Sequence, residues 1–140
     1  MSGISWKTDV GINHVGAYQV SGRPFATGSI NASTAVKVEF PKVTRWIYVV
    51  NHDGSNDCKI GFSEKGIRDD GAMGGGTNFL RIPTADAGEN TNSMRLELKI
   101  GELWLSGSSD VDVMAGLTNI DISKVSGSIG PSWSGSAGVG

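Results

Sequence analysis

The residues that could perform chemistry are few in this chain: two histidines, one cysteine and scattered carboxylates. A nucleophilic site needs a serine or cysteine beside a base and an orienting third group, and a Gly-x-Ser-x-Gly element commonly introduces it. The sequence contains no such element. His14 lies at the boundary of a polar N-terminal arm, and the adjacent pair His52 and Asp53 is typical of hydrogen bonding in a turn. We therefore predict no catalytic residue; an enzyme would need a cleft that joins His52, Asp53 and a third polar group.

Oxygen ligands for a metal ion occur in two turn-rich stretches, which contain Asp53, Asn56 and Asp57 in one case and Asp69 and Asp70 in the other. Neither stretch has the spacing of an EF-hand loop, so only an irregular calcium site could form, and solvated turns are the simpler interpretation. One cysteine and two histidines cannot complete a tetrahedral zinc site without carboxylates. No Lys-Ser/Thr pair follows the glycine-rich residues 71–76, which therefore indicate a flexible loop and not a phosphate cradle. We expect no metal and no cofactor.

Three aromatic residues, Trp46, Tyr48 and Trp104, could form a flat platform on which a sugar ring stacks. The alternative is that they pack in the core. A carbohydrate-binding or receptor-binding module is therefore a second hypothesis for the function.

The elements that position these residues are β-strands. Residues 94–100 place an apolar side chain at every second position and a charged one between, which predicts a half-buried strand. The same alternation returns in residues 36–40 and more loosely in 58–62, where Cys58 is expected to be a small buried residue. Residues 43–51 have apolar side chains at both odd and even positions, so both faces of this strand are apolar. This pattern indicates a central strand with the core on one side and a partly covered aromatic surface on the other.

These patterns predict an all-β, single-domain antiparallel β-sandwich with eight or nine strands. The expected strands cover residues 15–21, 25–31, 34–40, 43–51, 58–63, 78–83, 94–100, 103–106 and 110–117. We expect one hairpin between 43–51 and 58–63, and a second between 94–100 and 103–106 across a tight turn. Residues 64–77 lack periodicity and are interpreted as a mobile loop.

The domain boundaries follow from composition. Residues 1–13 form a polar N-terminal arm, residues 14–123 the sandwich, and residues 124–140 a flexible tail rich in glycine and serine. The arm and tail carry isolated apolar residues that could anchor the chain to a partner: Ile4, Trp6, Trp133 and Val139.

Charge and hydropathy exclude some partners. The net charge of −2 gives no bulk attraction to phosphate backbones, so we expect no nucleic acid. No apolar stretch approaches the ~20 residues of a membrane helix, and no secretion signal is evident, so we expect synthesis in the cytoplasm and no membrane.

Several segments taken together resemble a known class: residues 15–29, 38–63, 102–108 and 115–120. They are similar to small structural proteins of the virions of marine tailed phages and large algal viruses. The resemblance implies a jelly-roll-like sandwich that binds the outer capsid as a cement, decoration or vertex subunit. It also implies a homo-oligomer, located in the virion, whose partners are the major capsid protein or other virion proteins. The arm and the tail lie outside the resemblance.

Overall fold

The computed structural model describes residues 23–68, 76–85, 92–125 and 137–140. Their eight strands form two four-stranded sheets in which every pairing is antiparallel, so the predicted all-β fold is confirmed. Sheet A has the order β1 (Pro24–Ile30), β8 (Val111–Leu117), β3 (Thr44–Asn51) and β6 (Ser93–Leu96). Sheet B has the order β2 (Val36–Glu39), β7 (Glu102–Ser106), β4 (Cys58–Gly61) and β5 (Leu80–Ile82).

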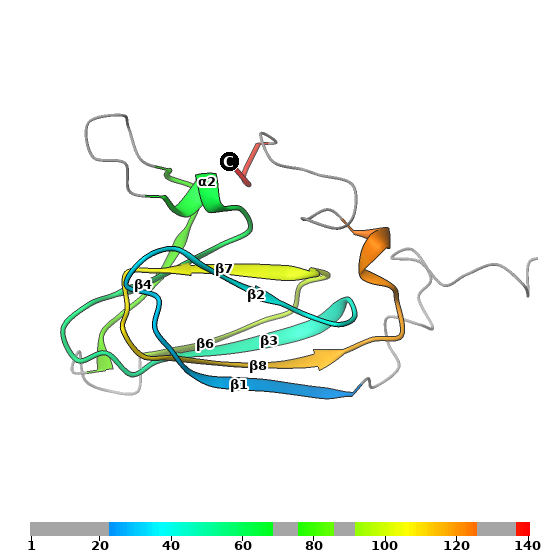
Figure 1. Cartoon of the computed structure of the whole chain (residues 1–140), viewed down its shortest axis with the longest axis horizontal. Helices are drawn as coiled ribbons and strands as arrows, with labels where there is room; N and C mark the ends of the chain where they lie inside the picture. The colour runs from blue at the N-terminus through cyan, green and yellow to red at the C-terminus, as the bar shows by residue number, and fades with distance from the viewer. Residues whose placement is uncertain (1–22, 69–75, 86–91, 126–136) are drawn as a thin grey trace, which may run out of the picture.

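The pairing of the strands follows a simple rule. The first strand pairs with the last, β2 with β7, β3 with β6, and β4 with β5. The pairs β3–β8 and β4–β7 then complete each sheet. Figure 1 shows the two layers from the side, with β1, β8 and β3 in one layer and β2 and β7 in the other. Strands that follow each other in the sequence therefore lie in opposite layers, except for β4 and β5.

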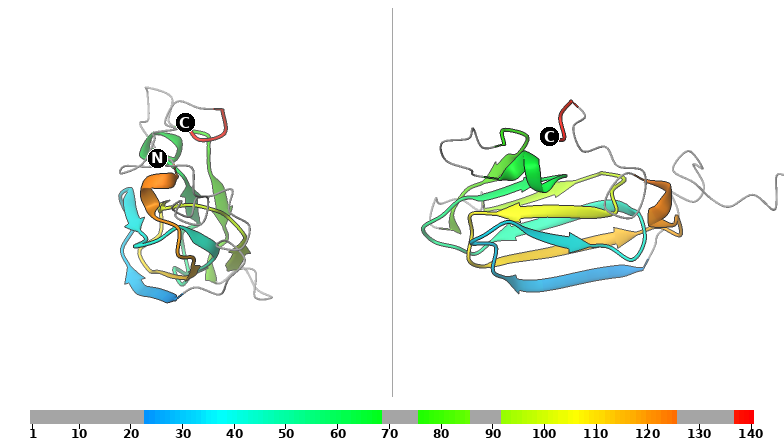
Figure 2. Two further views of the ribbon diagram at one scale, coloured as in Figure 1. Left: turned by 90° about the vertical axis from the view of Figure 1, so that its right-hand side faces the viewer. Right: turned by 45° about the horizontal axis from the view of Figure 1, so that its top comes forward.

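Figure 2 shows the two layers of strands in two further views, and the buried apolar side chains form one core cluster to which both layers contribute. Each strand contributes alternate residues: Ile47 and Val49 come from β3, and Val111 and Val113 from β8, all at most 1% exposed. Sheet B contributes β-branched and leucine side chains to the same cluster: Val38, Ile60, Ile82, Leu103 and Leu105. Cys58 is fully buried in this cluster, as expected, and burial raises the pKa of its thiol to about 12.

Both expected hairpins are wrong. β3 and β4 lie in different sheets, because residues 52–57 carry the chain across the sandwich instead of turning it back. β6 ends at Leu96 and β7 begins at Glu102, again in the opposite sheet. The buried Thr44 holds this second crossing, because its Oγ1 donates to the carbonyl of Leu98 at 2.6 Å and accepts from the N–H of Ile100 at 3.2 Å.

Residues 64–77 were expected to be a loop, but they begin with the short helix α2 (Glu64–Ile67). Ser63 caps this helix by accepting a hydrogen bond from the N–H of Gly66 at 3.0 Å. Ile67 is fully buried against β4 at Gly61, where an added Cβ would collide with its Cγ2. The helix therefore covers part of the outer side of sheet B, as Figure 1 shows.

Residues 118–125 and 137–140 are described beyond the last strand. The 3-10 turn η4 (Ile122–Lys124) adds Ile122 to a small second cluster around Val43 and Ile120. The expected strand at residues 15–21, the arm at 1–13 and most of the glycine-rich run lie outside the described residues. In the described part of the chain, no helix has the length and apolar character needed to cross a membrane.

Candidate functional site

The outer side of sheet A presents two of the three large hydrophobic side chains that are exposed among the described residues. We call it face A: Pro24, Ala26 and Gly28 on β1, Asp112, Met114 and Gly116 on β8, Trp46, Tyr48 and Val50 on β3, and Ser93 and Arg95 on β6. The strand register places Ala26, Met114, Tyr48 and Arg95 in one row across four strands. In this row Tyr48 is 37% exposed and Met114 48% exposed. A flat surface with a tyrosine and a flexible methionine at its centre is suited to contact with another protein.

Trp46 is fixed against the sheet by a glycine and an arginine. Its indole lies over Gly116, where an added Cβ would collide with Nε1. The guanidinium of Arg95 stands over the same ring, 5.5 Å from its centroid. A sugar that stacks on Trp46 would therefore have to displace Arg95.

The structure does not bring the three predicted platform residues together. Trp46 and Tyr48 lie on face A, whereas Trp104 lies on β7 in sheet B, on the other side of the sandwich. The indole Nε1 of Trp104 donates to Glu102 at 3.1 Å, and the ammonium of Lys37 lies 5.9 Å from its ring centroid. The three aromatic residues thus do not form a single platform. The central strand β3 does have the predicted aromatic outer surface.

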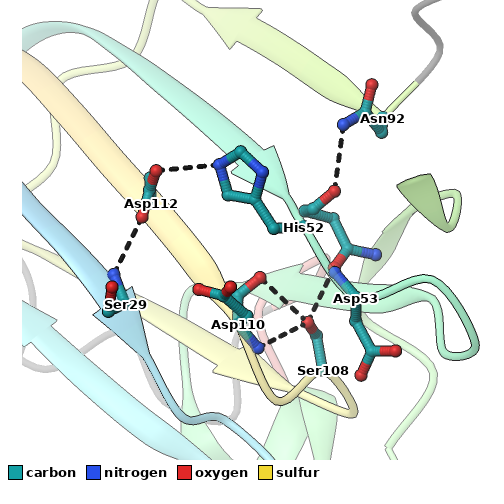
Figure 3. A network of polar contacts seen from close by, with 8 residues as sticks. Ser29, His52, Asp53, Asn92, Ser108, Asp110 and Asp112 are labelled. Atoms are coloured by element: carbon teal, nitrogen blue, oxygen red, sulfur yellow. Dashed lines mark hydrogen bonds and ion pairs between the residues drawn. The ribbon is translucent and has the colours of Figure 1, made fainter.

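His52 and Asp112, a residue of face A, lie in contact at the end of β3 (Figure 3). His52 Nε2 lies 2.8 Å from Asp112 Oδ2, and the other carboxylate oxygen accepts from the backbone N–H of Ser29 at 2.8 Å. These two contacts, the Ser29 bond first, lower the pKa of Asp112. Ser29 has a φ of 55° at a bulge in β1, and this left-handed backbone aims its N–H at the carboxylate. His52 was expected to bond Asp53 in a turn, but its ring contacts Asp112 instead.

Asn51, the residue before His52, holds loops of the fold together. Asn51 is fully buried, and its Nδ2 donates to the carbonyls of Asn56 at 2.9 Å and Pro83 at 3.0 Å. Its Oδ1 accepts from the hydroxyl of Ser108 at 2.7 Å and from the N–H of Asp53 at 3.1 Å. Asn51 therefore joins the crossing at residues 52–57 to two other loops at this end of the sandwich.

Asp53 completes this polar network and is not available to a metal. Its two carboxylate oxygens accept five hydrogen bonds, from the backbone and side chains of Ser109 and Asn56 and from the N–H of Ser55. The N–H groups of Ser109 and then Ser55 are the main causes that hold its pKa far below the usual value. Among the described residues, no group of three or more His, Cys, Asp or Glu side chains could hold a metal ion. The second candidate stretch, Asp69 and Asp70, lies outside them.

Of the predicted terminal anchors, only Val139 is described. Its carbonyl accepts from Ser63 Oγ of the same chain at 2.7 Å, and its side chain is half-buried. An added Cβ at Gly66 would collide with this carbonyl, so Val139 packs closely against α2. Ile4, Trp6 and Trp133 lie outside the described residues.

Sequence reasoning missed Met114, Ala26 and Arg95 as members of a shared surface. The signal for Met114 was present, because the alternation in residues 110–117 assigns Asp112, Met114 and Gly116 to the same side. Nothing in the sequence states that β8 lies between β1 and β3, which is what assembles the row.

Comparison with known proteins gives no assignment: no protein-family model, no curated protein and no solved structure matches this chain.

Proposed function

We propose that this chain is a jelly-roll structural subunit of a virion, which docks onto neighbouring capsid proteins through face A. The observation that carries the proposal is the pairing of the first strand with the last, β2 with β7, β3 with β6 and β4 with β5. An eight-stranded ribbon of this kind, folded so that successive pairs fall in opposite sheets, has the connectivity of a jelly roll, an architecture used by viral capsid and lectin domains. The resemblance of the sequence to small virion proteins favours the capsid.

Face A supports docking on physical grounds. Tyr48 and Met114 expose large side chains on the outer side of sheet A, and their neighbour Ala26 is small, so a partner can approach closely. Aromatic and methionine side chains are enriched at protein interfaces, and a few such residues commonly supply most of the binding free energy. On a symmetric shell, many copies of a weak contact add up through multivalency. In the proposal, homo-oligomers sit on the outer capsid, and the terminal residues Ile4, Trp6 and Trp133 add anchors to this contact, whereas Val139 packs against α2 on the side of sheet B.

The experiment compares two charge insertions. Particles that lack this protein are incubated with purified wild-type chain, Met114→Glu or Thr34→Glu, and the bound protein is measured after sedimentation. Thr34 is an exposed residue just before β2 in sheet B, so it controls for the added charge. We expect Met114→Glu to reduce occupancy by about tenfold or more, the effect of losing one central interface residue, and Thr34→Glu to bind normally. Equal binding of all three proteins would rule out face A as the contact, and absence of the wild-type chain from purified particles would rule out the virion.

A carbohydrate-binding module is the second candidate, because lectin domains share this architecture and Tyr48 exposes an aromatic ring beside Trp46 on face A. A glycan array probed with wild-type, Tyr48→Ala and Tyr48→Phe distinguishes the two functions. Sugar stacking predicts that Tyr48→Ala loses a bound glycan that Tyr48→Phe retains. Failure of the wild-type protein to bind any glycan would remove this candidate.

A further inference from the structure

An apolar groove of about 380 Å³ opens on the side of the sandwich where β5 and β6 are the edge strands. Its walls are mainly large apolar side chains: Ile60, Phe62, Phe79, Leu80, Leu96 and Leu98. The groove lies between the two sheets and is separate from face A.

Leu80 shows that the groove is an uncovered part of the core side of sheet B. It pairs in register with Ile60, so the two side chains point to the same side of the sheet. Ile60 is 2% exposed, whereas Leu80 is 47% exposed. The position that the strand pattern assigns to the core is therefore half open to solvent at the edge.

The opposite side of the same edge carries two positive charges next to each other. Lys59 and Arg81 are directly opposed across β4 and β5, and both lie over the ring of Phe79, at 4.7 Å and 5.3 Å from its centroid. Like charges at directly opposed positions of a sheet are destabilising. In the described part of the chain, neither cation takes part in an ion pair.

We propose that the edge of β5 with which no described strand pairs binds an extended segment of a partner protein in which apolar and acidic residues alternate. A strand that pairs with β5 continues sheet B, and its side chains alternate between the two sides of that sheet. The side chain beside Leu80 then enters the groove, and its sequence neighbours lie on the same side of the sheet as Arg81, with Lys59 one strand further away on β4. One peptide thus covers the exposed leucine and places acidic side chains next to Arg81, which offsets the repulsion between the opposed cations. This surface is independent of face A and extends the proposed function by naming the chemistry of a partner segment.

The alternative is that the two charges only prevent other strands from pairing with β5. Proteins prevent unwanted pairing at an edge strand by making it short, charged or interrupted by proline. β5 has three residues, and Pro83 follows it directly. A guarded edge predicts that no peptide binds there, whatever its charge.

The test uses fluorescence anisotropy with the full chain and three fluorescein-labelled heptapeptides of designed sequence. The probes alternate glutamate with leucine, lysine with leucine, or glutamate with serine. We expect the glutamate-leucine peptide to bind. The lysine-leucine peptide lacks the charge pairs and the glutamate-serine peptide lacks the apolar anchor, so we expect the affinity of each to be lower by about tenfold or more. Protection of the amides of residues 80–82 from hydrogen exchange on peptide binding locates the contact.

Three variants make the assignment to β5 specific. Arg81→Glu is expected to weaken the glutamate-leucine peptide and to gain binding to the lysine-leucine peptide, a reversal that a merely damaged fold cannot produce. Leu80→Ser is expected to weaken both leucine peptides, and Lys124→Glu, an equal charge change on η4, to alter neither. Binding that ignores peptide charge, or that Arg81→Glu leaves unchanged, would overturn the proposal. Absence of binding by every probe would also overturn it, in favour of a guarded edge.

Discussion

The outer sides of the two sheets carry similar residues but end up in different environments. Both present a tryptophan with a cation over its ring, Trp46 with Arg95 on sheet A and Trp104 with Lys37 on sheet B. Sheet B is partly covered by α2, whose Ile67 is fully buried. Tyr48 and Met114 on sheet A remain exposed among the described residues. Aromatic residues at outward positions therefore do not identify a binding surface; what matters is whether another element of the same chain covers them.

One glycine on each sheet makes this difference possible. Gly61 leaves room for Ile67 of α2, and Gly116 leaves room for the indole of Trp46. On sheet B the space is filled by the helix that directly follows β4, whereas on sheet A it is filled by a side chain of the neighbouring strand. Sheet B thus gains a buried contact that stabilises the fold, and sheet A gains a flat surface.

The largest expected effect compares the stability contributed by the side of sheet B beneath α2 with that contributed by face A. Ile67→Ala removes a fully buried side chain, and we expect it to lower the free energy of unfolding by about 3 kcal/mol. Met114→Ala on face A should change it by less than about 0.5 kcal/mol, because the side chain is half in solvent. Urea unfolding of both variants measures the two values. Equal losses would mean that face A is as much a part of the folded core as the contact beneath α2.

Gly116→Val tests how Trp46 is held. The new side chain needs the space that the indole occupies, so we expect a loss of about 1–3 kcal/mol from overpacking. We also expect displacement of Trp46 into solvent, seen as a red shift of its fluorescence. Subtracting the emission spectrum of Trp46→Phe from that of the wild type separates the emission of Trp46 from that of the other tryptophans. A Gly116→Val protein with unchanged stability and emission would show that the indole does not rest on the sheet.

Asp53 and Asp112 lie at the same end of the sandwich but differ in burial and in hydrogen bonding. Asp53 accepts five hydrogen bonds and is 8% exposed, whereas Asp112 lies on face A with its side chain 45% exposed. Hydrogen bonds to the ionised form lower the pKa of Asp53, so it stabilises the fold above the usual carboxyl pKa of 3.8 and progressively less as the pH falls below it.

We therefore expect Asp53→Asn to be destabilised at neutral pH and its difference from wild type to shrink as the pH falls below about 4. Asp112→Asn should show the same trend with a smaller amplitude, because solvent screens an exposed pair. Urea unfolding between pH 7 and pH 3 measures both. A constant difference across this range would contradict the role assigned to the Asp53 carboxylate.

The side to which each residue points could be predicted from the sequence. Alternation in residues 110–117 puts Val111 and Val113 on one side and Asp112 on the other, and the structure buries both valines while Asp112 lies on face A. The double apolar pattern of residues 43–51 predicted a central strand with an aromatic outer surface, which β3 is. These features are local, because the orientation of a side chain depends only on the extended backbone.

The pairing of the strands could not be predicted in the same way. The alternation of residues 94–100 continues past the end of β6, because Leu98 and Ile100 still pack on the core while the chain crosses to sheet B. Thr44, more than 50 residues away in the sequence, holds that crossing. Face A depends on the same non-local pairing, since β1, β8 and β3 are adjacent only in the folded chain.

The smallest expected effect concerns the cations on the edge of sheet B. Arg81→Glu replaces a like-charged pair with an opposite-charged pair across β4 and β5, which should raise the free energy of unfolding by about 0.2–1 kcal/mol. High salt should remove most of this gain, because the side chain of Arg81 is exposed. Thermal unfolding at low and high salt measures the change, with Lys124→Glu as the control. A stabilised variant that no longer binds an acidic peptide would show that the wild-type arginine lowers stability in return for recognition, whereas a destabilised one would show that Arg81 contributes mainly to the fold.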